Sequence, residues 1–281
     1  IDDNFLQFHE SQNYIKFTKN NIKKLLNKTN YFDFNSERED LVNYIKAETK
    51  QAISTIYEMG QKNILPYYEF PKEINDINKY LNNLNWSLPW TSGAQFAALC
   101  VFTQTQLTSE KEHSINSLVA FSDKLVNKKN GFYYLGNINN QTQLINGAMK
   151  ILTGLHWIEK EIHYPEKLID FCLNTEPNSE GCDLVDIVYV LYRCSLQTEY
   201  KLKEIKDYLV DLIDIIESHY FKNQGGFSYY QDKSQIYYYG LKITKGTKTP
   251  DIHGTILLVW ALSMIFDVIG YKEMNWNILK P

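Results

Sequence analysis

The sequence predicts an all-α protein built as an α/α toroid, that is, an incomplete double-layered helical barrel with an N-terminal helical extension. Two observations predict this fold. Four segments after residue 85 are apolar around most of their circumference, which is typical of helices buried on more than one side. Amphipathic segments with one wetter face alternate with them, and this alternation indicates an inner ring of helices covered by an outer ring.

The N-terminal segment, residues 1–85, is polar and predicted to be helical. Ser36 and Glu39 form a capping-box pattern, in which each side chain satisfies an amide of the other's segment. Apolar residues then recur at helical spacing, and Gly60 is a plausible stop. Two prolines in residues 64–73 predict a loop. We expect this segment to pack on a toroid formed by residues 86–281.

The toroid itself is predicted from the order of its segments. The inner helices are expected at 93–102, 147–155, 183–192 and 254–265. The outer helices are expected at 113–126, 165–173 and 201–220. Strand signals are local, and the sequence predicts one short hairpin that pairs Phe227–Tyr230 with Gln235–Tyr239.

Composition excludes some classes of function. The net charge is -4 and the chain has only two arginines, Arg38 and Arg193, so it lacks the basic footprint of a nucleic-acid binder. The 281 residues bury enough surface without disulfides or metal. The four cysteines have apolar neighbours, which favours reduced thiols and the cytoplasm.

The ends of the chain and its apolar runs bear on its context. The apolar run Ile256–Phe266 is shorter than a bilayer requires, so a soluble protein without a membrane span is expected. The first residue is Ile rather than Met, so we expect a trimmed chain or part of a longer chain or complex.

The last repeat carries a resemblance to known proteins. Gly225-Gly226-Phe227 is followed by Pro250-Asp251-Ile-His253-Gly-Thr255 and an apolar helix, which resembles the repeat of protein prenyltransferase β-subunits and squalene-type cyclases. A fainter match occurs at Gly131-Phe132. The resemblance implies an α/α toroid with a central cavity, a fold that sugar-processing enzymes also use. Fold alone does not give function.

The chemistry of that family fits this chain poorly. The resemblance implies a zinc ion held by an Asp, a Cys and a His, and His253 matches that His apart from a one-residue difference in spacing. Cys182-Asp183 reverses the order of the other two ligands and removes their spacer. We therefore predict no metal and no cofactor, with zinc as the weaker alternative. The cyclase acid motif Asp-x-Asp-Asp is also absent from the sequence.

Polar residues cluster near the N-terminal ends of the predicted inner helices, where amide groups and helix dipoles converge on one mouth. The residues predicted to carry chemistry are His253, Asp251, Asp183, Asp186 and Tyr238. The residues predicted to bind substrate are Trp90, Gln95, Asn146, Lys150, Arg193, Tyr230 and Tyr239. Plain helix capping by Asp251 and Asp183, and a structural His253, are the alternatives.

Three classes of function remain open at this point. The first is a carbohydrate-active or glycan-binding protein that takes a polar or acidic saccharide in the mouth, because tyrosine rings suit sugar faces. His253 with a carboxylate suits a lyase or epimerase, whereas Asp183 and Asp186, one helical turn apart, suit a hydrolase. The second is a prenyltransferase-like or terpenoid-cyclase-like enzyme. The third is a non-catalytic binding or scaffold module.

Overall fold

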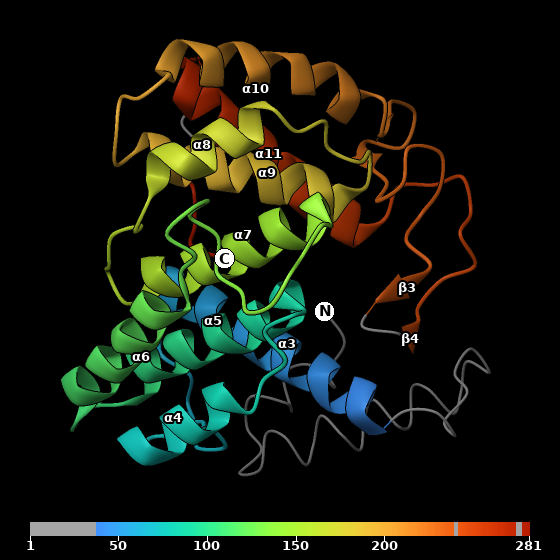
Figure 1. Cartoon of the computed structure of the whole chain (residues 1–281). Helices are drawn as coiled ribbons and strands as arrows, with labels where there is room; N and C mark the ends of the chain where they lie inside the picture. The colour runs from blue at the N-terminus through green and yellow to red at the C-terminus, as the bar shows by residue number, and fades with distance from the viewer. Residues whose placement is uncertain (1–37, 239–240, 274–276) are drawn as a thin grey trace.

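The computed structural model describes residues 38–238, 241–273 and 277–281, and these residues are predominantly helical (Figure 1). The helices are α3 (Arg38–Glu58), α4 (Ile74–Asn82), α5 (Pro89–Gln106), α6 (Lys111–Leu125), α7 (Gln141–Trp157), α8 (Pro165–Leu173), α9 (Gly181–Ser195), α10 (Leu202–Glu217) and α11 (Ile252–Ile269). The strands are β1 (Tyr220–Phe221), β2 (Gly226–Phe227), β3 (Tyr237–Tyr238) and β4 (Leu241–Lys242). The all-α prediction is confirmed.

Helices α5, α7, α9 and α11 pack side by side in chain order and run parallel (Figure 1). Small residues allow this close approach. A Cβ atom built on Gly93 meets the Lys150 Cβ at 3.0 Å, and one built on Gly154 meets the Phe96 ring at 2.8 Å. Larger side chains at these glycines would push α5 away from α7. The four N-terminal ends therefore lie toward one end of the molecule, as the sequence predicts.

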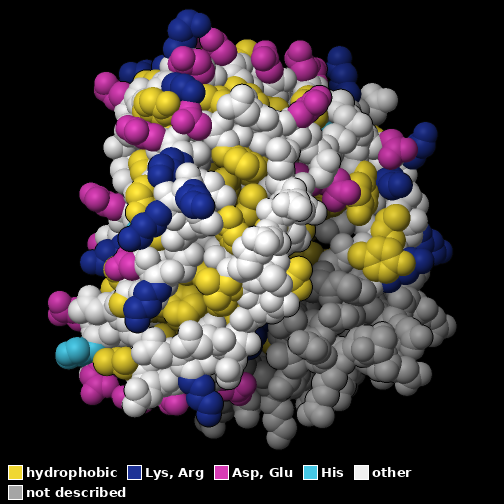
Figure 2. Space-filling view, viewed as in Figure 1, with side chains coloured by type: hydrophobic (Ala, Val, Ile, Leu, Met, Phe, Trp, Pro, Cys, Tyr) yellow, Lys and Arg dark blue, Asp and Glu magenta, His cyan; other side chains and the backbone are white. Residues whose placement is uncertain are grey.

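The amphipathic helices cover this inner row. Helix α6 packs on α5, α8 packs on α9, and α10 packs on both α9 and α11. In α10 the buried residues Ile205, Leu209, Leu212 and Ile216 recur every three or four positions, which places one apolar stripe against the inner row. Figure 2 shows acidic side chains along the edge of the molecule where α10 lies, because its opposite face carries Glu and Asp.

The N-terminal helix and the C-terminal tail meet the inner row at one place. Helix α3 packs against α5, and the ring of Tyr57 meets the ring of Trp157 of α7 edge-on, with centroids 5.7 Å apart. The Trp157 indole donates a hydrogen bond to the Pro281 carbonyl at 2.8 Å, and the Lys280 amide donates to Glu58 of α3. The tail thus ties the C-terminal ends of α3 and α7 together.

The described part of the N-terminal segment, residues 38–85, is largely helical, as predicted. Helix α3 ends near Gly60 as predicted, whereas the start of the capping box, Ser36, lies outside the described residues. Helix α4 follows the predicted loop and lies within the segment predicted to be helical, although its bounds were not predicted, and it buries Ile77 and Leu81 one turn apart. Helix α3 packs on α5 and α4 packs on α6, but the boundary at residue 85 and the toroid stay predictions.

The predicted hairpin between Phe227–Tyr230 and Gln235–Tyr239 is wrong. Strand β2 pairs with β1, and β3 pairs with β4. The physical reason is Asp251, whose carboxylate accepts the backbone amides of Tyr229 and Gln235 and so removes both from any ladder. Gly225, with a φ of +71°, makes the turn between β1 and β2.

Helix α11 closes the inner row. It has 18 residues with a mean hydropathy of 1.9, so by length and composition it is long and apolar enough to cross a membrane. It is the one helix among the described residues that meets this test. A core helix of a globular protein that meets the test is mostly buried, whereas 33% of α11 is buried. Leu258, Ala261, Met264 and Ile265 of α11 are fully buried against α9 and α10.

Candidate functional site

Side chains cap the N-terminal ends of two inner helices, α7 and α11. Asn140 caps α7 by accepting a hydrogen bond from the Gln143 amide at 3.1 Å. Asp251 caps α11 by accepting one from the Gly254 amide at 2.7 Å. Pro89 opens α5, at a position where its missing amide hydrogen costs nothing. These caps fix where the helices begin, and the polar side chains of their first turns then face a common region.

A polar cavity of about 320 Å³ opens between the N-terminal ends of α7 and α9. This volume falls within the range of small-ligand sites. Its lining is rich in amides, hydroxyls and carboxylates: Asn139, Gln141, Thr142, Ile145, Asn146, Thr175, Glu176, Pro177, Asn178, Asp183 and Ile187. The lining contains two carboxylates and no Lys, Arg or His. The cavity therefore offers hydrogen-bond partners to a ligand but no cation.

Hydrogen bonds hold the side chain of Asp183 in a fixed orientation in this cavity. It is 8% exposed, and its two carboxylate oxygens accept hydrogen bonds from the Asn146 amide at 2.7 Å and the Asn178 amide at 2.9 Å. Asn146 is itself buried on α7, whereas Asn178 lies in the loop before α9. The two amides fix the orientation of the carboxylate, and this contact brings together Asn146 and Asp183, which the sequence predicted separately.

Asp186 lies one helical turn after Asp183 and has a different environment. It is 1% exposed, and neither of its carboxylate oxygens has a hydrogen-bond partner among the residues that the structure describes. Burial raises the pKa of Asp186 to about 7, the nearby Lys150 ammonium opposes the rise, and the Asp183 charge adds to it. A carboxyl of this kind exchanges its proton near neutral pH.

His253 lies with the tyrosines, outside the lining of the cavity. Its Nδ1 and the Gln235 Oε1 are 2.7 Å apart, so the neutral ring donates from Nδ1. The ring stacks on Tyr229 with centroids 5.6 Å apart and meets the edge of Tyr238 at 5.1 Å. Burial lowers the pKa of His253 to about 4, with Asp251 opposing the fall and Lys150 adding to it.

A carboxylate beside His253, such as Asp251 or Asp183, was expected, whereas the side chain bonded to its Nδ1 is Gln235. The Asp251 carboxylate accepts three backbone amides, from Gly254 at 2.7 Å, Tyr229 at 2.8 Å and Gln235 at 3.0 Å. Asp251 thus caps α11 and holds the preceding loop, and Gln235 takes the place beside His253. The capping alternative weighed for Asp251 describes its observed contacts.

The remaining predicted residues are scattered. Arg193 lies ten residues beyond Asp183 on the same helix, about 15 Å along its axis, so its predicted place in the mouth is wrong. Gln95 accepts a hydrogen bond from Tyr80 at 2.7 Å. Trp90 and Tyr230 are half-buried. Tyr239 lies outside the described residues.

Sequence reasoning missed three residues of this region. Asn178 and Glu176 lie in the loop before α9, and Gln235 lies in the loop before α11. Asn178 had a usable signal, because it stands in a Pro-Asn-Ser turn three residues before the start of the inner helix α9. Gln235 had none, since its contact with His253 depends on how the loop folds back.

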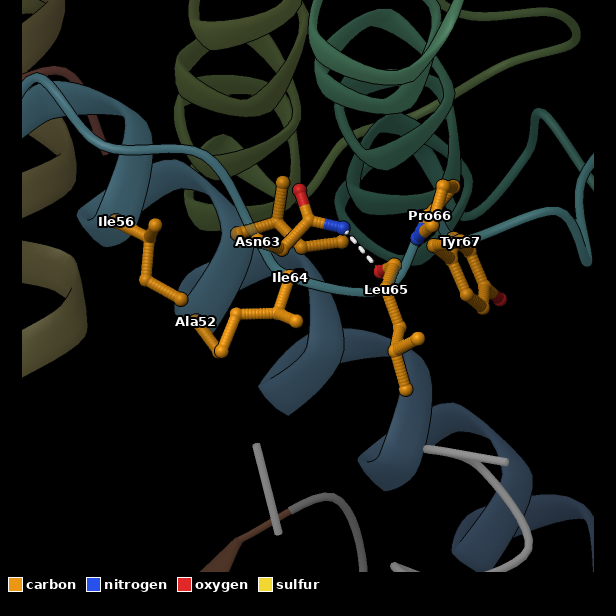
Figure 3. A pocket seen from close by; sticks show the side chains of 8 residues that line it. Ala52, Ile56, Asn63, Ile64, Leu65, Pro66 and Tyr67 are labelled. Atoms are coloured by element: carbon orange, nitrogen blue, oxygen red, sulfur yellow. Dashed lines mark hydrogen bonds between the residues drawn. The ribbon is translucent and has the colours of Figure 1, made fainter. Parts of the chain in front are cut away.

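A second cavity lies between α3 and the loop of residues 63–67 (Figure 3). Ala52 and Ile56 of α3 face Ile64 and Leu65 across it, and Asn63 donates a hydrogen bond to the Leu65 carbonyl. Its volume is about 30 Å³, room for only one or two waters. It is a packing gap beneath a loop and no ligand site.

The described residues contain no group of three or more His, Cys, Asp and Glu side chains placed to hold a metal ion. Cys182 is half-buried, and burial raises the pKa of its thiol to about 12, which disfavours the thiolate that zinc requires. The other three cysteines are buried and free. Among the described residues, Cys182 and His253 belong to no group of three side chains that could hold a zinc ion.

Comparison with known proteins adds no assignment. The sequence matches no protein-family model, no curated protein and no solved structure. The resemblance of the last repeat to prenyltransferase β-subunits and squalene-type cyclases stays a prediction that rests on those residues alone. Function must therefore be argued from the site.

Proposed function

We propose that the chain is an α/α-toroid protein that binds a polar, uncharged saccharide in the cavity between α7 and α9. The observation that carries this proposal is the lining of the cavity. Amide, hydroxyl and carboxylate groups accept and donate hydrogen bonds in the pattern that sugar hydroxyls require. The volume of about 320 Å³ accommodates one or two sugar rings in the range usual for small-ligand sites.

The charge of the lining argues for a neutral ligand. Glu176 and Asp183 are the only ionisable side chains that line the cavity, and both are acidic. A uronic acid or a diphosphate would bring like charge to these carboxylates without a lysine or arginine to offset it. This feature favours the saccharide proposal over the prenyl-diphosphate alternative and, within it, a neutral sugar over an acidic one.

Glycoside hydrolysis is the reaction that this site supports best. Asp186, with a pKa of about 7, holds a proton near neutral pH one turn from Asp183, whose oxygens are fixed by two amides. Hydrolysis uses such a pair, an acid with a raised pKa beside a second carboxylate. Asp186 and His253 both lie outside the cavity lining. Asp186 is one helical turn from the lining residue Asp183 on α9, whereas His253 lies on α11 and its Nδ1 is bonded to Gln235, and this difference favours hydrolysis over a lyase or epimerase reaction through His253.

Isothermal titration calorimetry tests the binding. The probes are neutral oligosaccharides, hexuronates and farnesyl diphosphate, each titrated into the whole chain. We expect heat only from neutral saccharides, and at one hundred times the dissociation constant we expect about 2.7 kcal/mol of added stability. Asp183→Asn and the more exposed Asn178→Ala should each weaken binding. Asp211→Asn, on the outward face of α10, is the matched control and should bind like the wild type.

Three outcomes would contradict the proposal. Binding of diphosphate with no response to saccharide would favour the prenyl-transfer alternative. Saccharide binding that is unchanged in both Asp183→Asn and Asn178→Ala would place the ligand elsewhere. No binding of any probe would favour the scaffold alternative. Release of reducing ends by the wild type, lost in Asp186→Asn, would establish the hydrolysis.

A further inference from the structure

The loop between α8 and α9 is anchored at both ends and exposed between them. Thr175 is 6% exposed, and its backbone carbonyl accepts a hydrogen bond from the Tyr208 hydroxyl at 2.7 Å. At the other end the Gly181 amide donates to the Tyr229 carbonyl at 2.9 Å, and a Cβ atom built on Gly181 would lie 3.1 Å from the Tyr229 ring. Residues 176–180 between these anchors are exposed or half-buried, and we call them the strap.

The side chain of Asn178 ties the strap to the rest of the polar cavity. Its Nδ2 donates one hydrogen bond to the Thr142 Oγ1 of α7 at 3.2 Å and another to the Asp183 Oδ2 of α9 at 2.9 Å. Both hydrogens of the amide nitrogen are therefore used. All three residues line the cavity, so this bridging amide joins the strap to both helix walls. Loss of its two bonds would let the strap move without breaking a helix.

The other polar groups near the strap leave its middle to the bridging amide. Glu180, at the second anchor, forms a side-chain hydrogen bond with Tyr229. The ring of His219 lies near the Ser179 backbone, but its Nδ1 donates to the Ser228 carbonyl at 2.8 Å. Burial lowers the pKa of His219, so the ring is neutral and its Nε2 has no hydrogen to donate to Ser179. Exposed segments held by so few bonds open at low free energy.

We propose that the strap opens to admit the saccharide and closes over it, with the Asn178 amide as its latch. The inference rests on the proposed function of the cavity between α7 and α9. The Asn178 Oδ1 accepts no hydrogen bond from the described residues, so a hydroxyl of the bound saccharide can donate to it. That contact requires the closed strap, and a ligand that gains a contact in one state shifts the equilibrium toward that state.

Digestion of the whole chain under native conditions measures how often the strap opens. A glutamyl endopeptidase can cut the Glu180–Gly181 bond, whereas proline protects the Glu176–Pro177 bond. When opening and closing are fast relative to cleavage, the rate of cleavage follows the population of the open state. Cleavage after Glu217, at the end of α10, is followed in the same digest and reports on the rest of the fold.

Variants of the latch should change cleavage after Glu180 and nothing else. Thr142→Val removes one neutral hydrogen bond and should raise the rate several-fold, whereas Asn178→Ala removes both bonds and should raise it about tenfold or more. Thr142→Ser keeps the hydroxyl, and Ser179→Ala changes the strap but not the latch, so both should match the wild type. Thr142 is remote from the cut bond in the chain, so an effect there is independent of the sequence preference of the protease.

The outcomes separate the latch from the proposed function. A neutral oligosaccharide that binds by calorimetry should slow cleavage after Glu180 about tenfold or more near saturation and leave cleavage after Glu217 unchanged. Cleavage after Glu180 that stays at the wild-type rate in both Thr142→Val and Asn178→Ala would overturn the latch. Saccharide binding without protection of Glu180 would overturn the closure. No saccharide binding, with both variants still cut faster, would instead overturn the proposed function and confirm the latch.

Discussion

Asp251 offers the sharpest test of how this fold is held together, because one carboxylate connects a helix to the loop before it. Its Oδ1 accepts the Gly254 amide that starts α11, and its Oδ2 accepts the amides of Tyr229 and Gln235. Asn140 is the matched comparison, since it caps α7 through the single amide of Gln143. We expect Asp251→Ala to destabilise the protein far more than Asn140→Ala.

The magnitude follows from the number and kind of bonds. Loss of an N-cap costs about 1 kcal/mol, which is the whole effect expected for Asn140→Ala. Each hydrogen bond to a charged group contributes about 1.5–3 kcal/mol when buried, and Asp251 is half-buried. Asp251→Ala should therefore cost about 3–5 kcal/mol. Asp251→Asn keeps the cap at Oδ1 but puts an amide donor where Oδ2 accepts two bonds, so we expect about 2–4 kcal/mol.

Urea denaturation followed by circular dichroism measures all three variants, and the tryptophan fluorescence should report the same midpoint if unfolding is two-state. The expected order of stability is wild type, Asn140→Ala, Asp251→Asn and Asp251→Ala. An Asp251→Ala variant as stable as Asn140→Ala would refute the reasoning, because it would show that the bonds to the loop contribute nothing.

The remaining predictions concern Asp186 and Gly254. Burial raises the pKa of Asp186 from 3.8 to about 7, so the folded state binds the proton more tightly and the free energy of unfolding should fall as pH rises from about 4 to 7, by at most about 4 kcal/mol. Urea titrations of wild type and Asp186→Asn at several pH values measure this effect as the difference between the two free energies of unfolding. Taking the difference removes the opposite pH dependence of His253, whose pKa is lowered. Free energies of the two proteins that change in parallel with pH would contradict the prediction. A Cβ atom on Gly254 overlaps the backbone nitrogen of Tyr229, so Gly254→Ala should cost more than 2 kcal/mol in thermal unfolding, and a neutral effect would show that the loop shifts freely.

Helix positions were the most predictable feature, because they depend on local hydrophobic periodicity and on nearby residues that start or stop a helix. Outer helix α8 begins and ends at the predicted residues, and α10 lies within its predicted range. The bounds of helix α4 were not predicted within the helical N-terminal segment, because only two of its residues, Ile77 and Leu81, are buried. The tyrosine-rich loop was predicted as a hairpin because its strand signals are real, but a distant carboxylate takes its amides.

The candidate site was predictable in its parts but not in their grouping. Asn146 and Asp183 were both predicted and do meet. Asp251 was predicted to take part in the reaction, whereas its carboxylate accepts hydrogen bonds from backbone amides. Arg193 was predicted for the mouth but lies toward the opposite end of α9. A residue type and its spacing along one helix indicate what a side chain can do, whereas its partners belong to other helices.

The sequence by itself determined the helical class, the alternation of buried and half-exposed helices, and the presence of polar residues in the first turns of the inner helices. These follow from hydrophobic periodicity, which acts over a few residues. Only the tertiary structure decided that the polar residues divide into an amide-rich cavity at Asp183 and a histidine held by Gln235. The physical reason is that desolvation and hydrogen-bond geometry are set by the packing of helices far apart in the chain, which periodicity does not encode.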